Sequence, residues 1–172
     1  GIFGLNPVVH YGTEAQKSRM LPPIICRDDI ACFAVTEAET GLDTTRLKTK
    51  AVRKNDRYVV HGQKAWTTTA QVANKILLIA RTAEESPSGK PIDGLSLFYT
   101  DLDRSKVEIR KIPKMGRECV DSNLVFFDGM EIPFDDRIDA LLDHEDAVAK
   151  RRGGGEGRGA GLEVEVILHR PT

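Results

Sequence analysis

The sequence predicts a mainly β protein, a β-barrel or β-sandwich with a short N-terminal helix and an irregular C-terminal tail. Three observations support this. Short runs of strand-forming residues recur about every ten residues between Leu47 and Phe127, with turn signals between them. A capped helical segment precedes them. After Asp139 the composition changes, and six of the nine residues from Gly153 to Gly161 are glycine, which is typical of a linker.

Composition narrows the class of protein. The chain has 172 residues, of which 40% are hydrophobic and 30% charged, and its net charge is -1. These values are typical of a globular domain and give no sign of a nucleic-acid or anionic-membrane partner. No apolar run is long enough to span a bilayer. The chain starts at Gly1 with no visible signal peptide, so we expect a fragment of a longer protein.

The cysteines favour a reducing compartment. Cys26, Cys32 and Cys119 form an odd set without close spacing, which argues against a disulfide framework and against a zinc site. We therefore expect three reduced thiols that behave as small apolar groups, and no bound metal.

One helix is expected near the N-terminus, from Thr13 to Leu21. Thr13 can cap it, and Gln16 stands three residues on, as in a capping box. Pro22-Pro23 is expected to end this helix. Residues Gly1 to Val9 are expected to form a loop or a frayed helix end, with Asn6-Pro7 as a breaker.

The β region is expected to begin with a strand from Ile30 to Thr36. A hairpin follows, because Asn55-Asp56 favours a tight two-residue turn between two strand-like runs. The run from Lys75 to Arg81 is short and very apolar, which indicates a strand buried on both faces. The expected strands are Leu47 to Lys54, Arg57 to Gly62, Gln63 to Thr68, Lys75 to Arg81, Leu95 to Thr100, Val107 to Ile112 and Asn123 to Phe127, with a loop from Glu84 to Asp93.

Two polar stretches are predicted to face one ligand. The first is Phe33 to Asp43, where an apolar run ends in threonine, acid and glycine, as a buried strand does at a ligand-facing loop. The second is Gly62 to Thr69, which holds the only tryptophan, Trp66, followed by three hydroxyls. The alternatives are ordinary ones: a solvated turn for Thr36, and a core position for the indole.

These stretches resemble the signature of the acyl-CoA dehydrogenase family. The family pattern aromatic-x-x-Thr-Glu-Pro-x-x-Gly-Ser-Asp matches Phe33 to Asp43, and the pattern Asn-Gly-x-Lys-x-Trp-Ile-Thr matches His61 to Thr68. Further matches, in the same order as in the family, are Gly12 to Lys17, Ala80-Arg-Thr82, Lys114-Met-Gly116 and Phe126 to Pro133. The resemblance covers about Gly1 to Ile138.

The resemblance implies three parts of the chain. Residues 1-29 would end an N-terminal helical domain, residues 30-138 would form the middle β-domain that binds flavin and acyl-CoA, and residues 139-172 would be an atypical linker or truncated tail. In the family a C-terminal helical domain supplies the glutamate base. We therefore expect no catalytic residue in this chain and no turnover by it alone. An altered or truncated frame of a longer gene would explain the tail.

The family implies FAD as cofactor. On that basis Phe33, Val35, Thr36 and Gly41 would hold the flavin from the first stretch, with Thr36 at its polar edge. Trp66 would stack on the isoalloxazine and Thr68 would reach its N5 and O4 edge, on the same side of a regular strand as the indole.

Two substrate positions are also implied, Leu42 and Thr82. The family commonly has serine where Leu42 stands, so a backbone amide, Thr40 or Thr44 would have to replace that hydroxyl, or phosphate binding would be weaker. Ala38 replaces the usual proline and makes the loop less rigid. The cations Arg110, Lys111 and Lys114 could attract phosphates of CoA or simply form a solvated face.

The implied activity is α,β-dehydrogenation of an acyl-CoA thioester by a flavoprotein oxidoreductase of fatty acid metabolism. The implied partners of a full-length enzyme are the acyl-CoA substrate, an electron-transfer flavoprotein or similar acceptor, and further copies of itself. Two alternatives stay open: an acyl-CoA oxidase, and a β-domain that has lost flavin and serves as a binding or assembly module. The sequence leaves the compartment open, with the mitochondrial matrix or the bacterial cytoplasm implied by the family alone.

Three other motifs are weaker. Gly155 to Ala160 fits a loose dinucleotide fingerprint, but no strand precedes it. The acidic run Asp143 to Asp146 contains a histidine, but neighbouring residues of a helix point in different directions. Lys150 to Arg152 is too short to indicate a targeting or nucleic-acid segment.

Overall fold

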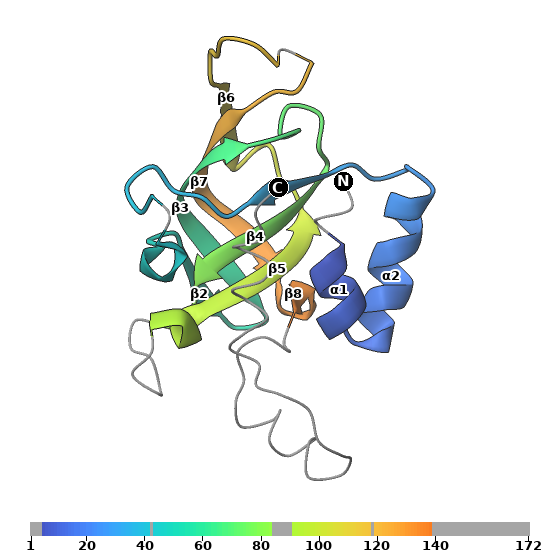
Figure 1. The fold of residues 1–172 in the computed structure, drawn as a ribbon. Coiled ribbons are helices and arrows are strands. Elements are labelled where there is room, and N and C mark those ends of the chain that lie inside the picture. The colour runs from blue at the N-terminus through green and yellow to red at the C-terminus, as the bar shows by residue number, and fades with distance from the viewer. Residues whose placement is uncertain (1–4, 42, 84–90, 118, 139–172) are drawn as a thin grey trace, which may run out of the picture.

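The computed structural model describes residues 5–41, 43–83, 91–117 and 119–138. Two helices lie side by side against one flank of a strongly twisted sheet (Figure 1). The predicted tail, the three weaker motifs within it and most of the predicted loop from Glu84 to Asp93 lie outside the described residues.

The helices are α1, Asn6–Tyr11, and α2, Glu14–Ile25. The predicted capping box at the start of α2 is confirmed: Thr13 Oγ1 accepts the Gln16 N–H at 3.2 Å, and Gln16 Oε1 accepts the Thr13 N–H at 2.9 Å. Pro22 and Pro23 do not end the helix, contrary to the prediction. A proline has no N–H to bond the carbonyl four residues earlier. Here those carbonyls belong to the exposed residues Ser18 and Arg19, so water can solvate them.

The N-terminal segment also differs from its prediction. Pro7 lies in the first turn of α1 and not at a break. A proline there loses no helical hydrogen bond, and its fixed φ favours the helix.

The strands are β1, Ala31–Ala34; β2, Lys50–Lys54; β3, Arg57–Thr67; β4, Lys75–Arg81; β5, Leu95–Asp101; β6, Val107–Lys111; β7, Asn123–Pro133; and β8, Arg137–Ile138. They form one sheet in the order β6-β7-β3-β2-β4-β5-β8, with β1 paired to β4. The predicted mainly β fold is confirmed. Within the described residues the sheet curls without closing, since β6 and β8 are not paired.

Most strand predictions agree with the structure. The hairpin between β2 and β3 turns at Asn55-Asp56, with Asn55 at φ 56°. The segments predicted as Arg57 to Gly62 and Gln63 to Thr68 form a single strand, β3, with register shifts against β7. β7 is longer than predicted and ends at Pro133.

The sheet has a hydrophobic core on each face of β4. One core lies inside the curl, and the other lies between β4, β5 and the helices. Ile76, Leu77 and Leu78 are fully buried, so the prediction that this strand is buried on both faces is confirmed. The helices are fixed to the sheet by Gln16, whose Nε2 donates to the carbonyls of Asp135 at 2.9 Å and Arg137 at 2.7 Å.

No helix among the described residues has the length and apolar character needed to cross a bilayer.

Candidate functional site

The candidate site lies where β1 ends. β1 runs parallel to β4, with Ala34 opposite Leu78, and Thr36 follows two residues beyond. The Thr36 carbonyl accepts the N–H of Ala65 at 2.8 Å, which brings the first predicted stretch against the second. The two stretches, far apart in sequence, therefore meet as predicted.

One edge of β1 has no strand partner in the described sheet. The Ile30 carbonyl accepts the Lys75 N–H at 3.0 Å, so even-numbered residues of β1 direct their backbone groups at β4. Backbone groups of alternate residues face opposite edges of a strand. Phe33 therefore faces the other edge, where its amide could meet a ligand. Val35 follows the end of β1, and its carbonyl accepts from Lys64 Nζ.

The Phe33 ring is directed elsewhere. It is half-buried against the core beneath the helices. Only its backbone is placed to serve the predicted site.

Trp66 stands at an irregular end of β3. Its φ is 61°, in the left-handed region, and its side chain is 59% exposed. The alternative of a core tryptophan is therefore wrong. Thr68 is exposed as well, while Thr67 between them is only 1% exposed. Trp66 and Thr68 thus both lie on the solvent side, despite the register shift between Lys64 and Thr67. An exposed indole at this position offers a flat face to a planar ring.

A buried ion pair lies under the meeting point of the two stretches. Lys64 Nζ lies 2.9 Å from Glu37 Oε1 and donates to the Val35 carbonyl, also at 2.9 Å. Burial lowers the pKa of Lys64 to about 8, although the Glu37 charge opposes this. Burial alone would raise the pKa of Glu37, but the Lys64 charge and hydrogen bonds from Thr49 and Lys48 lower it below its ordinary value.

Glu37 also closes the loop that carries Gly41. Its carboxylate accepts the N–H groups of Lys48 at 2.7 Å and Thr49 at 3.0 Å, on the far side of the loop. Gly41 lies in this loop at φ 56°, exposed, with open space where a Cβ would stand. The predicted substrate residue Leu42 lies outside the described residues.

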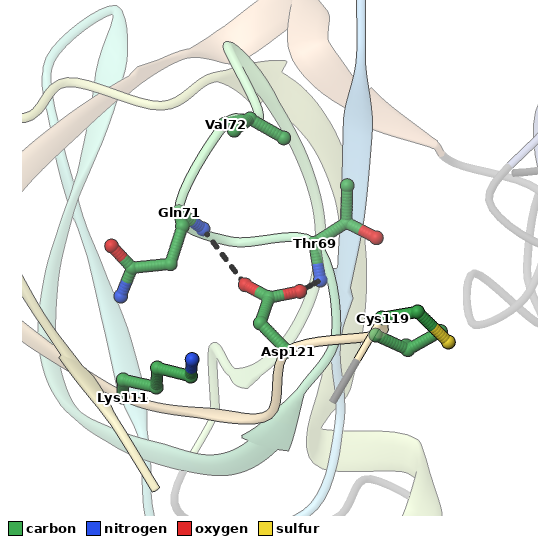
Figure 2. Close-up of a pocket in the computed structure, with 7 residues that line it drawn as sticks. Thr69, Gln71, Val72, Lys111, Cys119 and Asp121 are labelled. Atoms are coloured by element: carbon green, nitrogen blue, oxygen red, sulfur yellow. Dashed lines mark hydrogen bonds between the residues drawn. The ribbon is translucent and has the colours of Figure 1, made fainter. Parts of the chain in front are cut away.

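The chain turns sharply after Thr68, and Asp121 holds this turn. Its carboxylate accepts the N–H groups of Thr69 at 2.7 Å and Gln71 at 3.3 Å, as Figure 2 shows. Burial alone would raise the pKa of Asp121, but hydrogen bonds from Asn123, Thr69 and Gln71 lower it below its ordinary value. An open pocket of about 570 Å³ lies here, lined by Thr69, Gln71, Val72, Lys111, Cys119, Val120 and Asp121.

Thr82 lies at the same end of the sheet as Thr36, because it follows β4 directly. Its hydroxyl is 2.7 Å from Ser96 Oγ, and its N–H donates to the Gly94 carbonyl at 2.9 Å. Thr82 thus has hydrogen-bond partners within the fold, in the segment that carries Gly94 and Ser96.

Two of the predicted basic residues, Arg110 and Lys114, have local partners. The Arg110 guanidinium bonds Glu108 at 2.6 Å and lies over the Phe126 ring, 5.1 Å from its centre. Lys114 donates to the Val120 carbonyl. Lys111 lines the pocket of Figure 2.

The arrangement suits a flat ligand with a polar edge. The exposed indole supplies a stacking face. Within the described part of the chain, the hydroxyls of Thr36 and Thr68 form no hydrogen bond to another protein group, so both can bond a ligand. An isoalloxazine ring, flat and edged with carbonyl and imine groups, fits this set of donors. The described residues contain no group of three or more His, Cys, Asp or Glu side chains that could hold a metal.

Sequence reasoning missed four residues that organise the site: Glu37, Lys64, Asp121 and Asn123. The first two stand inside the matched motifs, and a lysine in the middle of a strand that carries few other charges was an available signal. Nothing in the local sequence distinguished the other two.

Comparison with known proteins gives consistent matches. A family model described as "Acyl-CoA dehydrogenase, middle domain" matches residues 32–130. The acyl-CoA dehydrogenase AFT10-1 of Alternaria alternata is 31% identical over 131 residues, which is 76% of this chain and 29% of that protein. The crystal structure of an acyl-CoA dehydrogenase from Geobacillus kaustophilus matches with a TM-score of 0.71 at 30% identity, over 77% of this chain and 34% of that one.

One structural match is to an enzyme named for a different reaction. The prolyl acyl carrier protein oxidase AnaB matches with a TM-score of 0.70 at 29% identity, over 80% of this chain and 38% of that one. The chain thus spans about a third of the length of these relatives.

Proposed function

The chain belongs to the acyl-CoA dehydrogenase family, and from that premise we propose that it forms the flavin-binding wall of an FAD-dependent acyl-CoA dehydrogenase. One observation carries the proposal. The indole of Trp66 stands 59% exposed beside the hydroxyl of Thr68, where the backbone of Thr36 bonds the same strand. The exposed indole offers a stacking face, and the two unengaged hydroxyls can bond the polar edge of a flat ligand.

Each residue has a role in the proposed site. Trp66 stacks on the isoalloxazine and excludes water from one face of it. Thr36 and Thr68 donate to its polar edge. The backbone N–H of Phe33, on the unpaired edge of β1, and that of Val35, just after the strand, donate to the ligand as well. Gly41 lets the loop backbone approach the ligand closely, because it has no side chain.

FAD bound here would accept a hydride at N5, and the protein would supply orientation and electrostatics. Hydrogen-bond donors fixed at the N5 and O4 edge favour the reduced, negatively charged ring, because they meet its charge without reorganising. That is the contribution we assign to Thr68. Leu42 and Thr82 would lie toward the acyl-CoA, with Leu42 unable to donate as a serine would.

The wider assignments rest on the family. We propose that residues 1–29 complete an N-terminal helical domain, that residues 30–138 are the middle domain, and that residues 139–172 form a linker or tail. We also propose an acyl-CoA substrate, an electron-transfer flavoprotein or similar acceptor, and self-association for the full-length enzyme. The family model that this chain matches, over residues 32–130, is that of the middle domain, and the family resemblance assigns the catalytic base to the C-terminal helical domain, so we propose that this chain alone gives no turnover.

The test is a titration of the purified chain with FAD. Trp66 is the only tryptophan, so its emission reports on this site alone. Stacking of flavin on the indole should quench that emission in proportion to occupancy, and the Trp66→Phe variant, followed by flavin fluorescence, should bind more weakly.

A chain that is folded by circular dichroism but neither binds FAD nor changes in Trp66 emission would contradict the proposal. If a longer protein that includes the rest of the family fold also fails to bind, the alternative of a non-catalytic assembly module is favoured. The match to a prolyl acyl carrier protein oxidase favours a second enzymatic candidate, an acyl oxidase. Rapid reoxidation of the reduced flavoprotein by oxygen would select the oxidase.

A further inference from the structure

We infer that Asp121 and Asn123 are positioning residues that fix the backbone on both sides of Thr68 and thereby aim its hydroxyl and the neighbouring indole at the ligand. The expected effect on flavin affinity rests on the proposed function. Its structural part can be tested without flavin.

Asn123 holds the peptide group before Thr68. Its side chain is fully buried, and its Nδ2 donates to the Thr67 carbonyl at 2.9 Å. The carbonyl of Thr67 belongs to the peptide plane that joins it to Thr68, so this bond fixes the orientation of that plane. Asn123 Oδ1 also accepts from Gln71 Nε2 at 2.8 Å, which leaves the amide little freedom to rotate.

Asp121 holds the peptide group after Thr68. Its Oδ1 accepts the Thr69 N–H at 2.7 Å, and that N–H belongs to the next peptide plane. Its Oδ2 accepts from Asn123 Nδ2 at 2.6 Å, which couples the two side chains. With both flanking planes fixed, the φ and ψ of Thr68 are fixed, and so is the direction of its Cα–Cβ bond.

The backbone around Thr68 needs this support. Trp66 has φ 61° and Thr69 has φ 70°, and neither is glycine. Residues with a Cβ persist in the left-handed region only when surrounding bonds hold them there, and such residues cluster at ligand sites. A carboxylate accepting backbone amides forms hydrogen bonds stronger than neutral ones, so it suits this role.

Arg104 adds support through the carbonyl groups of the same turn. Its Nη2 donates to the carbonyls of Ala70 at 2.9 Å, Gln71 at 3.0 Å and Ala73 at 2.8 Å. Asp121 therefore accepts hydrogen bonds from amide groups of this turn, and Arg104 donates hydrogen bonds to its carbonyl groups. The turn after Thr68 is held by charged side chains at both kinds of backbone group.

The experiment compares Asp121→Ala and Asp121→Asn with a control, Glu131→Ala. The Glu131 carboxylate also accepts a hydrogen bond, from Arg57 Nη1 at 2.5 Å, and it stands on β7 as Asn123 does, but toward the other end of that strand and outside the candidate site. The first measurement uses flavin-free protein: acrylamide quenching and anisotropy of Trp66 emission, with hydrogen exchange of the segment from Thr67 to Ala73. The second is the FAD dissociation constant with the midpoint potential of the bound flavin.

Asp121→Ala should speed exchange in the turn at least tenfold, lower the anisotropy of Trp66, weaken FAD about tenfold or more and shift the potential to a more negative value. Asp121→Asn keeps one acceptor for the Thr69 N–H and should recover part of each effect. Glu131→Ala should leave all four values unchanged.

The inference is overturned if exchange in the turn and Trp66 anisotropy are the same in Asp121→Ala as in the wild type. It is also overturned if these change while FAD affinity and potential do not, because Asp121 would then be merely structural. If the wild type binds no FAD, the proposed function fails on its own, and the flavin-free measurements alone decide whether Asp121 orients Trp66 and Thr68.

Discussion

Lys64 Nζ lies 2.9 Å from Glu37 Oε1, with side chains 0% and 4% exposed. This pair joins the end of β1 to the part of β3 that leads to Trp66. Because Glu37 also accepts two amides from the far side of the Gly41 loop, three segments of the candidate site meet at one carboxylate. The geometry of the site therefore depends on a buried ion pair beneath it.

Glu37→Gln should destabilise the fold strongly. Removing one partner of a buried pair leaves an uncompensated charge, which costs about 3–5 kcal/mol. We expect the free energy of unfolding, measured by urea denaturation at pH 7, to fall by that amount.

Glu39→Gln is the matched control. Glu39 pairs with Lys48 in the same loop, but these side chains are 60% and 69% exposed. Exposed pairs contribute about 0–1 kcal/mol, so this variant should resemble the wild type. Equal losses for the two variants would mean that Glu37 does not carry the charge we assign to it.

The contribution of Glu37 should disappear in acid. Its pKa in the fold is lowered from the ordinary value of 4.5, so its contribution is complete above 4.5 and is lost as the pH falls through the folded value. Lys64, with a pKa of about 8, stays protonated across this range. The difference in unfolding free energy between wild type and Glu37→Gln should therefore shrink steadily below pH 4.5, in urea titrations at several pH values. A difference that stays constant down to pH 3 would contradict this.

Local sequence patterns predicted much of the fold. β4 was predicted from Lys75 to Arg81 and has those bounds, because an apolar run of that length between turn signals has few alternatives. The capping box at Thr13 was predicted for a similar reason, since all its bonds lie within four residues. The proline pair was misjudged because its effect depends on whether water can reach the carbonyls one turn earlier, which the sequence does not show.

The support of the candidate site could not be predicted in the same way. Glu37 and Lys64 are 27 residues apart, and Asp121 is 52 residues from Thr69. Such contacts depend on strand register, and a bulge changes which side chains share a face. The motif match placed Thr36 and Trp66 in one site, but the residues that hold them there follow only from the three-dimensional arrangement.

Gly62 should not tolerate a side chain. A Cβ there would lie 2.7 Å from Thr49 Cα and 2.8 Å from Thr49 Oγ1, at φ 144°. Thr49 cannot move away easily, because its N–H is bonded to Glu37 and its hydroxyl to the Gln63 carbonyl. We expect Gly62→Ala to cost about 2–4 kcal/mol from overpacking and backbone strain together.

Gly41→Ala separates these two causes. Gly41 also has a positive φ, but nothing lies within 4 Å of an added Cβ. It should cost only the strain, about 1–2 kcal/mol. Thermal unfolding of both variants makes the comparison, and a Gly62→Ala protein as stable as Gly41→Ala would show that the strands separate freely at this point.

Trp66→Phe should separate ligand binding from stability. Because the indole is 59% exposed, the smaller ring should change the unfolding free energy by no more than about 0.5 kcal/mol. The loss of stacking area should weaken FAD about tenfold, as about 1.4 kcal/mol of lost interaction implies. Flavin fluorescence measures the affinity, since the variant has no tryptophan. Val52→Ala is the control, because Val52 is an exposed apolar residue of β2, 51% accessible, and should leave FAD binding unchanged. If the Trp66→Phe protein has a melting temperature several degrees lower but binds FAD normally, Trp66 stabilises the fold and does not bind the flavin.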